Sequence, residues 1–567
     1  VSGNVLPDEF IISKKCIQNN YSSIISKKMG HKNEKIVFDI ENGGVKYEPL
    51  VNYDKNNFSL DEDNIILLSK WILRIEDLYS NIYKRDCPMD IEWGFDGNDL
   101  YILQARPETV YSRKENNKFT QYKTKKLNNK ILASGTAIGD SIGIGYVKNF
   151  DTIDQVTNDN FKKGDVLVTD ITDPDWEPIM KRASAIITNK GGRTCHAAIV
   201  ARELGVVTIV GTIDATSKLK DGMLVSVVCS EGEVGNVYEG SISYETEIID
   251  LNTLPKIDTK LMMNLANPEL AFKVAQLPNS GVGLLREEFI INNYIKVHPL
   301  ALLDYDKIKD DSVKLQIDKI TIGYKDKKKY FIDKLTYGLS TIATAFYQKD
   351  VIARFSDFKS NEYYNLLGGC LYEPHEENPM IGWRGASRYY SDTYKKAFGL
   401  ECMAIKRVRE EYGLTNVIVM LPFVRTVGEC QRVLDTMESF GLKRGENGLK
   451  VYIMCEIPSN VICAEEFCEL VDGFSIGSND LTQLTLGLDR DSELVAHLYD
   501  ENNLAIRRLL SSVIKTCKRK GVKIGICGQG PSDSKEFAEF LVKENIDTIS
   551  LTPDSIVKTI INISKLK

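Results

Sequence analysis

The chain has 567 residues, enough for several domains, and its 43% hydrophobic and 27% charged content is that of an ordinary globular protein. A net charge of −7 argues against a nucleic-acid or anionic-membrane partner, and no apolar run approaches the ~20 residues that span a bilayer. The twelve cysteines form no Cys-x-x-Cys pairs, so we expect neither a zinc site nor a disulfide framework. Because the first residues also do not read as a signal peptide, we expect a cytoplasmic protein.

The first region, residues 1–112, ends in a sequence typical of a β-hairpin. Residues 89–107 predict two strands joined by an Asp-Gly-Asn-Asp turn. Glu92 and Gln104 would then lie on the paired strands, and their oxygens are suitable ligands for magnesium on a nucleotide. On the residues alone, ordinary surface polar side chains on a hairpin are the favoured interpretation.

The next region predicts a compact α/β domain between two linkers. Residues 113–130 are polar and rich in Lys and Asn, which is typical of a linker. Residues 131–240 alternate strand and helix signals, and a second linker is expected at 241–258. Its ~18 residues could span about 60 Å at most, which suits a domain that moves between two sites.

The most informative segment of this domain is 188–202, Thr-Asn-Lys-Gly-Gly-Arg-Thr-Cys-His-Ala-Ala-Ile-Val-Ala-Arg. Two glycines permit a tight turn, and Thr194 is a good N-cap for the Ala/Ile/Val-rich helix that follows. His196 would then lie in the first helical turn, where free N–H groups favour an anion. A neutral imidazole there could accept a phosphoryl group; the alternative is a half-buried histidine without a catalytic role.

From residue 260 onward the sequence predicts a (β/α)8 barrel. Eight short apolar runs are separated by helix-length segments, at residues 261–265, 281–285, 351–354, 416–421, 449–455, 473–476, 522–526 and 547–551. Eight strands interleaved with helices in about 300 residues fit this architecture. The long interval between the second and third runs requires an insertion.

Polar residues follow these predicted strands, where barrels of this kind place their catalytic groups. They are Arg286, Arg354, Glu456, Gly477, Ser478, Asn479, Asp480 and Cys527, with Arg384 on a further loop. Carboxylates can hold Mg²⁺ and arginines can grip a phosphate or carboxylate, so the set predicts a site for a small anion and a divalent metal. Taken singly, each charged residue is more often part of a surface ion pair, and a free cysteine is more often an inert buried thiol.

These motifs resemble those of the phosphoenolpyruvate-utilising enzymes. Segment 188–202 is similar to the phosphohistidine loop of that family, and its Cys195-His196 pair most resembles the phosphoenolpyruvate synthase (pyruvate, water dikinase) branch. The segments 281–286, 354–363, 382–388, 477–483 and 525–529 resemble the barrel motifs. Two positions depart from the family pattern. Val207 lies in a stretch where a proline is usual after the glycine. Glu287 replaces an uncharged residue, and its charge is expected to weaken anion binding at Arg286 slightly.

The resemblance implies an α/β multidomain protein. Residues 1–112 would be the C-terminal part of an ATP-grasp nucleotide-binding domain, 131–240 a swivelling β/β/α phosphohistidine domain, and 259–567 a TIM barrel that binds pyruvate or phosphoenolpyruvate. The front of the ATP-grasp domain is not present in the sequence, so we interpret the chain as N-terminally truncated. We also expect a homodimer formed through the barrel.

The implied reaction is ATP + pyruvate + water = AMP + phosphoenolpyruvate + phosphate, through a phosphohistidine at His196. The resemblance makes Cys527 the proton donor and assigns magnesium to Glu456 and Asp480. It places the substrate against Arg286, Arg354, Arg384, Glu456, Gly477, Ser478, Asn479 and Asp480, and ATP against Glu92, Gln104 and Arg106. As a fragment, the chain is expected to perform only the half-reaction between phosphoenolpyruvate and pyruvate. Pyruvate, phosphate dikinase and a non-catalytic phosphocarrier or pseudoenzyme remain alternatives.

Overall fold

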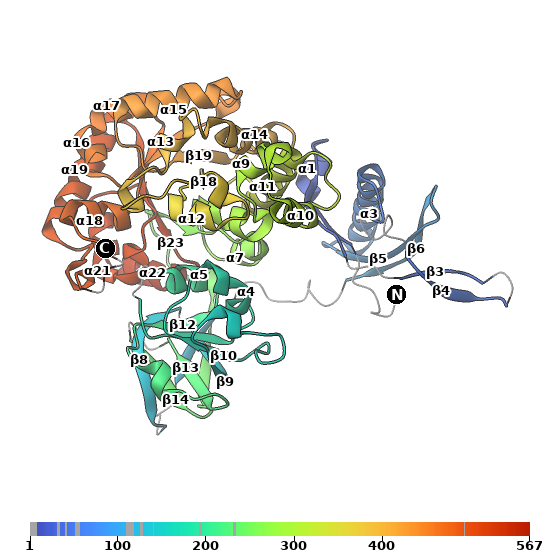
Figure 1. The fold of residues 1–567 in the computed structure, drawn as a ribbon, viewed down its shortest axis with the longest axis horizontal. Coiled ribbons are helices and arrows are strands. Elements are labelled where there is room, and N and C mark those ends of the chain that lie inside the picture. The colour runs from blue at the N-terminus through green and yellow to red at the C-terminus, as the bar shows by residue number, and fades with distance from the viewer. Residues whose placement is uncertain are drawn as a thin grey trace.

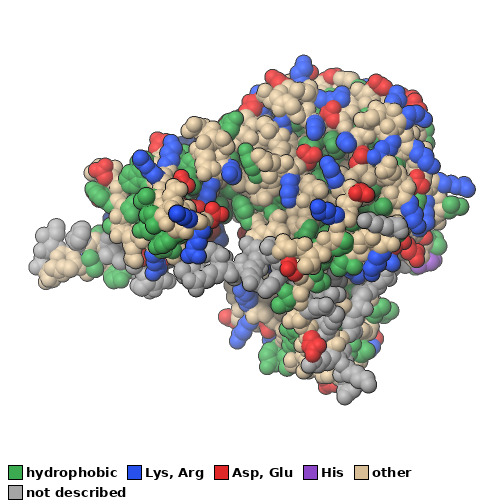
Figure 2. Space-filling view, turned by 180° about the vertical axis from the view of Figure 1, so that it is seen from behind, with side chains coloured by type: hydrophobic (Ala, Val, Ile, Leu, Met, Phe, Trp, Pro, Cys, Tyr) green, Lys and Arg blue, Asp and Glu red, His purple; other side chains and the backbone are tan. Residues whose placement is uncertain are grey.

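Three parts follow one another along the chain in the computed structural model (Figure 1). The structure describes residues 8–30, 34–39, 42–50, 57–108, 118–124, 129–139, 141–191, 195–230, 234–490, 492 and 494–566. Within this part of the chain, no helix is both long enough and apolar enough to cross a bilayer. Basic and acidic side chains are intermixed over the face of the molecule in Figure 2.

In its described residues, the N-terminal part has three separate antiparallel strand pairs and two helices. Its elements are β1 (Glu9–Ile12), α1 (Lys14–Gln18), β2 (Ile24–Lys28), β3 (Glu34–Phe38), β4 (Val45–Pro49), α3 (Glu62–Tyr83), β5 (Met89–Phe95) and β6 (Leu100–Pro107). The predicted hairpin is confirmed as β5 and β6, and the turn is closed by Asp96, whose Oδ1 accepts from the backbone N–H groups of Asn98 and Asp99 at 2.9 Å. The start of this part is attached to the barrel, because Tyr412 Oη donates to the Ile24 carbonyl at 2.9 Å and Thr341 Oγ1 to the Ile25 carbonyl at 3.0 Å.

The two expected linkers differ from the prediction, because parts of them pair with each other. Strand β7 (Lys118–Thr124) and strand β15 (Tyr244–Asp250) form an antiparallel ribbon of seven residue pairs. The rings of Tyr122 and Tyr244 lie 5.7 Å apart across it. A calculation of reach from freely extended linkers therefore does not apply to these segments.

The second part is a closed barrel in the strand order β10-β11-β12-β8-β14-β13-β9. Its elements are β8 (Ile131–Ile138), β9 (Ile142–Asn149), β10 (Val166–Thr169), α4 (Glu177–Met180), β11 (Ala185–Thr188), α5 (His196–Leu204), β12 (Val207–Val210), α6 (Ala215–Lys218), β13 (Leu224–Val228) and β14 (Val234–Glu239). Strands β10, β11 and β12 are buried along their whole length, which explains why their sequences are rich in Val and Ile and carry no charged residue. One face packs inside the barrel, and the other packs beneath α5 through Ala197, Ala198 and Ala201.

The third part is a closed barrel of eight parallel strands in sequential order. They are β16 (Lys260–Asn264), β17 (Gly281–Arg286), β18 (Asp350–Arg354), β19 (Val417–Leu421), β20 (Val451–Cys455), β21 (Gly473–Ile476), β22 (Lys523–Ile526) and β23 (Thr548–Leu551), one in each predicted run. The predicted insertion between β17 and β18 contains α8 (Glu287–Ile290), a π-helix (Ile291–Ile295), α9 (Pro299–Leu303), α10 (Asp311–Ile320) and α11 (Lys327–Ala345).

The remaining helices surround the barrel (Figure 1). They are α7 (Ala271–Val274), α12 (Ser360–Asn365), α13 (Ala386–Tyr389), α14 (Lys395–Glu410), α15 (Val427–Ser439), α16 (Pro458–Ile462), α17 (Ala464–Leu470), α18 (Ser478–Leu486), α19 (Leu504–Lys520), α20 (Gly530–Asp533), α21 (Lys535–Lys543) and α22 (Ile556–Ile563). Apolar side chains that alternate along the strands fill the barrel interior, including Met262, Ile418, Met420 and Met454, with Cys527 among them.

A buried ion cluster ties the loop after β18 to the insertion. The side chain of Glu373 is fully buried and accepts two hydrogen bonds from Arg388, at 2.8 and 2.5 Å. His298 Nε2 lies 3.0 Å from the same carboxylate, and its Nδ1 accepts from the Leu300 N–H at 3.2 Å, so Nε2 carries the proton. The carboxylate is therefore the only negative charge that compensates Arg388 in this cluster.

We expect Glu373→Ala to lower the free energy of unfolding of the barrel by about 3–5 kcal/mol, because it leaves the Arg388 charge buried without a partner. The measurement is urea unfolding followed by intrinsic fluorescence. As a control, Glu438→Ala removes the exposed Glu438–Lys443 pair and should leave the midpoint unchanged. Equal midpoints for Glu373→Ala and the parent protein would contradict the prediction.

Candidate active site

The predicted phosphoryl acceptor lies at the start of α5. His196 is its first residue, and Cys195 occupies the N-cap position with φ −71° and ψ 165°. The sequence predicted Thr194 as the N-cap; the structure places Cys195 there, and Thr194 lies outside the described residues. Gly191 is required in the preceding turn, since its φ is +103° and a Cβ there would lie 2.6 Å from Cys195 Sγ. Thr172 Oγ1 lies 3.2 Å from His196 Nδ1 and fixes the ring.

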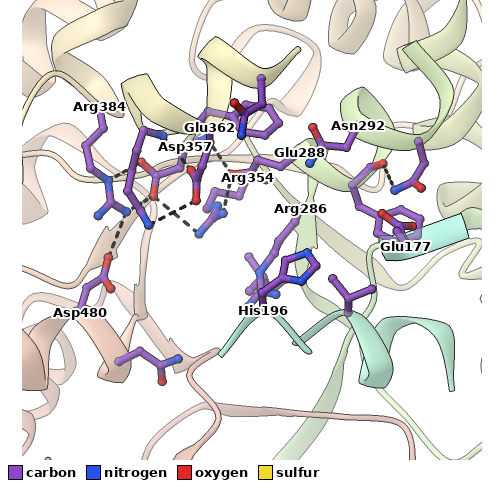
Figure 3. Close-up of a pocket in the computed structure, with 18 of the residues that line it drawn as sticks. Glu177, His196, Arg286, Glu288, Asn292, Arg354, Asp357, Glu362, Arg384 and Asp480 are labelled. Carbon is purple, nitrogen blue, oxygen red and sulfur yellow. Dashed lines mark hydrogen bonds and ion pairs between the residues drawn. The ribbon is translucent and has the colours of Figure 1, made fainter. Parts of the chain in front are cut away.

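The second part lies against the mouth of the eight-stranded barrel, so that His196 faces it (Figure 3). Arg202, on the same helix as His196, pairs with Asp533 at 2.8 Å and donates to Gln529. Lys181 Nζ donates to Asn293 Oδ1 at 3.1 Å from the other side. The imidazole is thereby held over a cavity of about 730 Å³.

Most of the predicted barrel residues line this one cavity with His196. They are Arg286, Arg354, Arg384, Glu456, Gly477, Asn479, Asp480 and Cys527. Arg286 and Arg354 are direct neighbours, because they pair in register at the ends of β17 and β18. Ser478 differs, since its side chain is fully buried behind the wall. Its contact with a ligand would have to come from its backbone N–H in the first turn of α18.

Two of the arginines are held very differently. Arg384 lies between Asp357 and Asp480, with Nε to Asp357 at 3.0 Å and Nη2 to Asp480 at 3.0 Å, and its Nη1 donates to the Met380 carbonyl (Figure 3). All its nitrogens are engaged, so the geometry favours a role in fixing these carboxylates over the predicted anion contact. Arg354 Nη2 pairs with Glu288 at 2.5 Å, but its buried Nε has no hydrogen-bond partner among the described residues. A buried N–H without a partner is uncommon in a folded protein, and Arg354 lines the cavity.

Nine charged residues that line the cavity were not predicted from the sequence: Asp175, Glu177, Lys181, Glu288, Lys296, Asp357, Lys359, Glu362 and Arg490. Glu288 and Asp357 follow β17 and β18 within three residues, so the rule that found the arginines could have found them too. Arg490 lies beyond α18 in a loop, and it pairs with Asp480 at 3.2 Å. The expected effect of Glu287 on Arg286 is not supported, because Glu287 is fully buried and Glu288 is the glutamate that faces the cavity.

Glu456 and Asp480 form a pair of carboxylates that suits a divalent cation. Burial, followed by the charges of Asp480 and Asp357, raises the pKa of Glu456 to about 8. Burial works against ionisation of Asp480 too, but Arg384 and Arg490 outweigh it and lower its pKa. No cluster of three or more His, Cys, Asp or Glu ligands occurs in the described ranges. Two carboxylates, with substrate and water oxygens in the other positions, are a typical donor set for Mg²⁺.

Cys527 closes the barrel interior below the cavity. It is 1% exposed, and burial raises the pKa of its thiol to about 11. Asn264 Nδ2 donates to its carbonyl at 3.1 Å and fixes the backbone. At neutral pH the group is a thiol, which can give a proton to a carbon atom of a bound molecule.

The predicted nucleotide residues form a separate group on the β5–β6 hairpin, away from the barrel mouth (Figure 1). Glu92 and Gln104 are directly paired across the two strands. Arg106 is exposed and pairs with Asp90 at 2.8 Å. Glu92 and Gln104, whose oxygens suit a metal ion such as Mg²⁺, therefore lie in a different part of the molecule from His196.

Comparisons with known proteins agree with this division. A family model described as "PEP-utilising enzyme, PEP-binding domain" matches residues 244–567, one described as "PEP-utilising enzyme, mobile domain" matches 161–232, and one described as "Pyruvate phosphate dikinase, AMP/ATP-binding domain" matches 1–126. The chain is 52% identical to the phosphoenolpyruvate synthase of Aquifex aeolicus, with 100% of the chain and 72% of that protein covered. It is similar to the phosphoenolpyruvate synthases of Synechocystis sp. (52%; 100% and 69% covered) and Escherichia coli (50%; 100% and 71% covered).

Proposed function

Because the chain belongs to the family of phosphoenolpyruvate-utilising enzymes, we infer that it is a pyruvate, water dikinase, which forms phosphoenolpyruvate, AMP and phosphate from pyruvate, ATP and water. The observation that supports this inference most directly is the single cavity shared by His196, Arg286, Arg354 and Cys527. Its chemistry matches the substrate, since phosphoenolpyruvate carries a phosphate, a carboxylate and a carbon atom that gains a proton. The relatives named above support water over phosphate as co-substrate, because each of the three is a phosphoenolpyruvate synthase.

Substrate binding is assigned to the residues at the ends of β17 and β18. Arg286 and Arg354 would bind the phosphate and carboxylate, with the unpartnered Arg354 Nε as one donor. Glu456 and Asp480 would hold the divalent metal, for which we propose Mg²⁺, and the bound metal would supply positive charge to the carboxylate and enolate oxygens. Arg384 would keep Asp357 and Asp480 in place.

Phosphoryl transfer is assigned to His196. Thr172 Oγ1 would accept from Nδ1–H, which leaves the Nε2 lone pair for phosphorus. From phosphoenolpyruvate, the P–O bond breaks, the Nε2–P bond forms, and the enolate takes a proton from the Cys527 thiol at its terminal carbon to give pyruvate. The thiolate then recovers a proton from water. In the forward direction the same steps run in reverse, with transfer governed by alignment and charge compensation. Glu92, Gln104 and Arg106 are proposed to contact ATP and its metal.

The experiment that tests this function is transfer of label from [³²P]phosphoenolpyruvate to the protein, followed by its removal with unlabelled pyruvate. Burial lowers the pKa of His196 to about 4. Only the neutral imidazole is a nucleophile, so labelling should stay constant as the pH falls below 7 and decline only near pH 4. A histidine with an unshifted pKa would instead lose its labelling near pH ~6.5. A protein that takes no label, or label that pyruvate does not remove, would overturn the function.

A further inference from the structure

Two carboxyl groups lie side by side in the core, outside the cavity. Glu287, the first residue of α8, and Glu401, in α14, are both 0% exposed. Neither side-chain oxygen of Glu287 has a hydrogen-bond donor in the described part of the chain, apart from what Glu401 can provide. If both groups were ionised, two adjacent charges would be removed from water without a cation between them, at a high cost in free energy.

A single proton resolves this conflict. Burial, and next the charge of Glu401, raise the pKa of Glu287 well above its usual range. Burial also raises the pKa of Glu401, while hydrogen bonds from Ser356 and Glu287 oppose that rise. Glu401 Oε2 accepts from the Ser356 N–H at 3.0 Å, and its Oε1 accepts from Ser356 Oγ at 2.8 Å. A neutral Glu287 can donate to this carboxylate, so that Glu401 is satisfied by three donors.

Among the described residues, the titratable groups around the pair offer no other compensating charge. Those that face it are Glu288, Arg354, Tyr363, Tyr389, Tyr394 and Cys402. Arg354 is the cation among them, and it is already paired with Glu288. Burial raises the pKa of the tyrosines and of the thiol, so all four stay neutral.

The pair acts on the segment that carries two residues of the cavity. Ser356, held by Glu401, stands between Arg354 and Asp357 in the chain. On the cavity side, Glu288 Oε1 accepts from Arg354 Nη2 at 2.5 Å and from the Asp357 N–H at 2.7 Å. Consecutive residues of α8 therefore hold this segment from opposite faces, Glu288 directly and Glu287 through Glu401.

We propose that Glu287 and Glu401 share one proton, and that this carboxylic acid–carboxylate pair positions Arg354 and Asp357 for phosphoryl transfer. The positioning role rests on the proposed function; the shared proton does not. When alkaline pH removes the proton, repulsion between the two carboxylates displaces Ser356 and with it Arg354. The KM for phosphoenolpyruvate then rises before kcat changes.

The shared proton is tested by infrared difference spectroscopy on protein with ¹³C-labelled glutamate. At neutral pH, the parent protein minus Glu287→Gln should show the carbonyl stretch of one protonated carboxylic acid. The exposed-site variant Glu438→Gln is the control and should show none. No such band in the Glu287→Gln difference spectrum would overturn the proposal.

The positioning role is tested by the pH dependence of labelling from phosphoenolpyruvate. Glu287→Gln keeps a permanent N–H donor to Glu401, so its KM should stay level at least about one pH unit beyond the rise in the parent protein. Glu287→Leu fills the space without a donor and should raise the KM at neutral pH about tenfold, the effect of one lost hydrogen bond. The same alkaline rise in the parent and Glu287→Gln would overturn the positioning role. Failure of the parent protein to be labelled at all would instead overturn the proposed function, and the infrared result would still decide the shared proton.

Discussion

A His196→Ala variant should take no label from phosphoenolpyruvate, a loss of roughly 10⁴-fold or more, because it removes the nucleophile itself. Among the residues that the structure describes, no other histidine lines the cavity. Cys527, which also lines the cavity, is a thiol whose pKa is raised to about 11 by burial, so it is almost entirely protonated at neutral pH.

This variant should fold normally. Alanine is well tolerated in the first turn of α5, and the docking contacts Arg202–Asp533 and Lys181–Asn293 are untouched. His375 and His497 are both exposed and lie outside the cavity, so His375→Ala and His497→Ala are matched controls that should keep full labelling. Label on His196→Ala protein, or its loss from both controls, would refute the assignment.

Cys527→Ala should reduce proton exchange at the methyl group of pyruvate by roughly 10²–10⁴-fold, the usual contribution of a positioned acid or base. The measurement is deuterium uptake from D₂O into pyruvate in the presence of the metal and phosphoenolpyruvate. Phosphorylation of His196 should survive better than exchange, because the thiol acts on the carbon end of the substrate and not on the phosphate.

The pH dependence separates this thiol from the other titrating groups. Exchange into pyruvate begins when the thiolate removes a methyl proton, so a pKa raised to about 11 means that exchange through Cys527 should increase as the pH rises toward 11. A decline of exchange near pH 8–9 would therefore come from the titration of carboxyl groups and not from Cys527. The exposed thiol of Cys370 offers a control, since Cys370→Ala should exchange at the parent rate. Normal exchange by Cys527→Ala would show that another group moves the proton.

Local patterns were sufficient for the elements that position the site. Each of the eight barrel strands coincides with a short apolar run, because strands buried on both faces need continuous apolar sequence. The rule that catalytic groups follow such strands predicts Arg286, Arg354, Glu456 and Asp480 at the barrel mouth, and all four line one cavity there. The motif around His196 likewise predicted its place in the first turn of a helix.

What the sequence did not predict depends on contacts between distant segments. Arg384 was expected to face a ligand, but Asp357 and Asp480, from two other loops, engage its nitrogens. Nothing local distinguishes Glu287 from Glu288, yet one points into the core and the other into the cavity, since neighbouring residues at a helix start diverge by about 100°. The N-cap was misplaced by one residue because Thr194 has the better intrinsic preference than Cys195.

The β7–β15 ribbon constrains the two chain connections of the histidine-bearing part. The two connections pair with each other over seven residue pairs. One double-stranded ribbon, and not two independent linkers, therefore leads into this part of the molecule. Because the two connections are paired, the backbone of each is fixed by the other along these residues. A paired connection has less conformational freedom than two separate linkers, so holding His196 at the barrel mouth costs less conformational entropy.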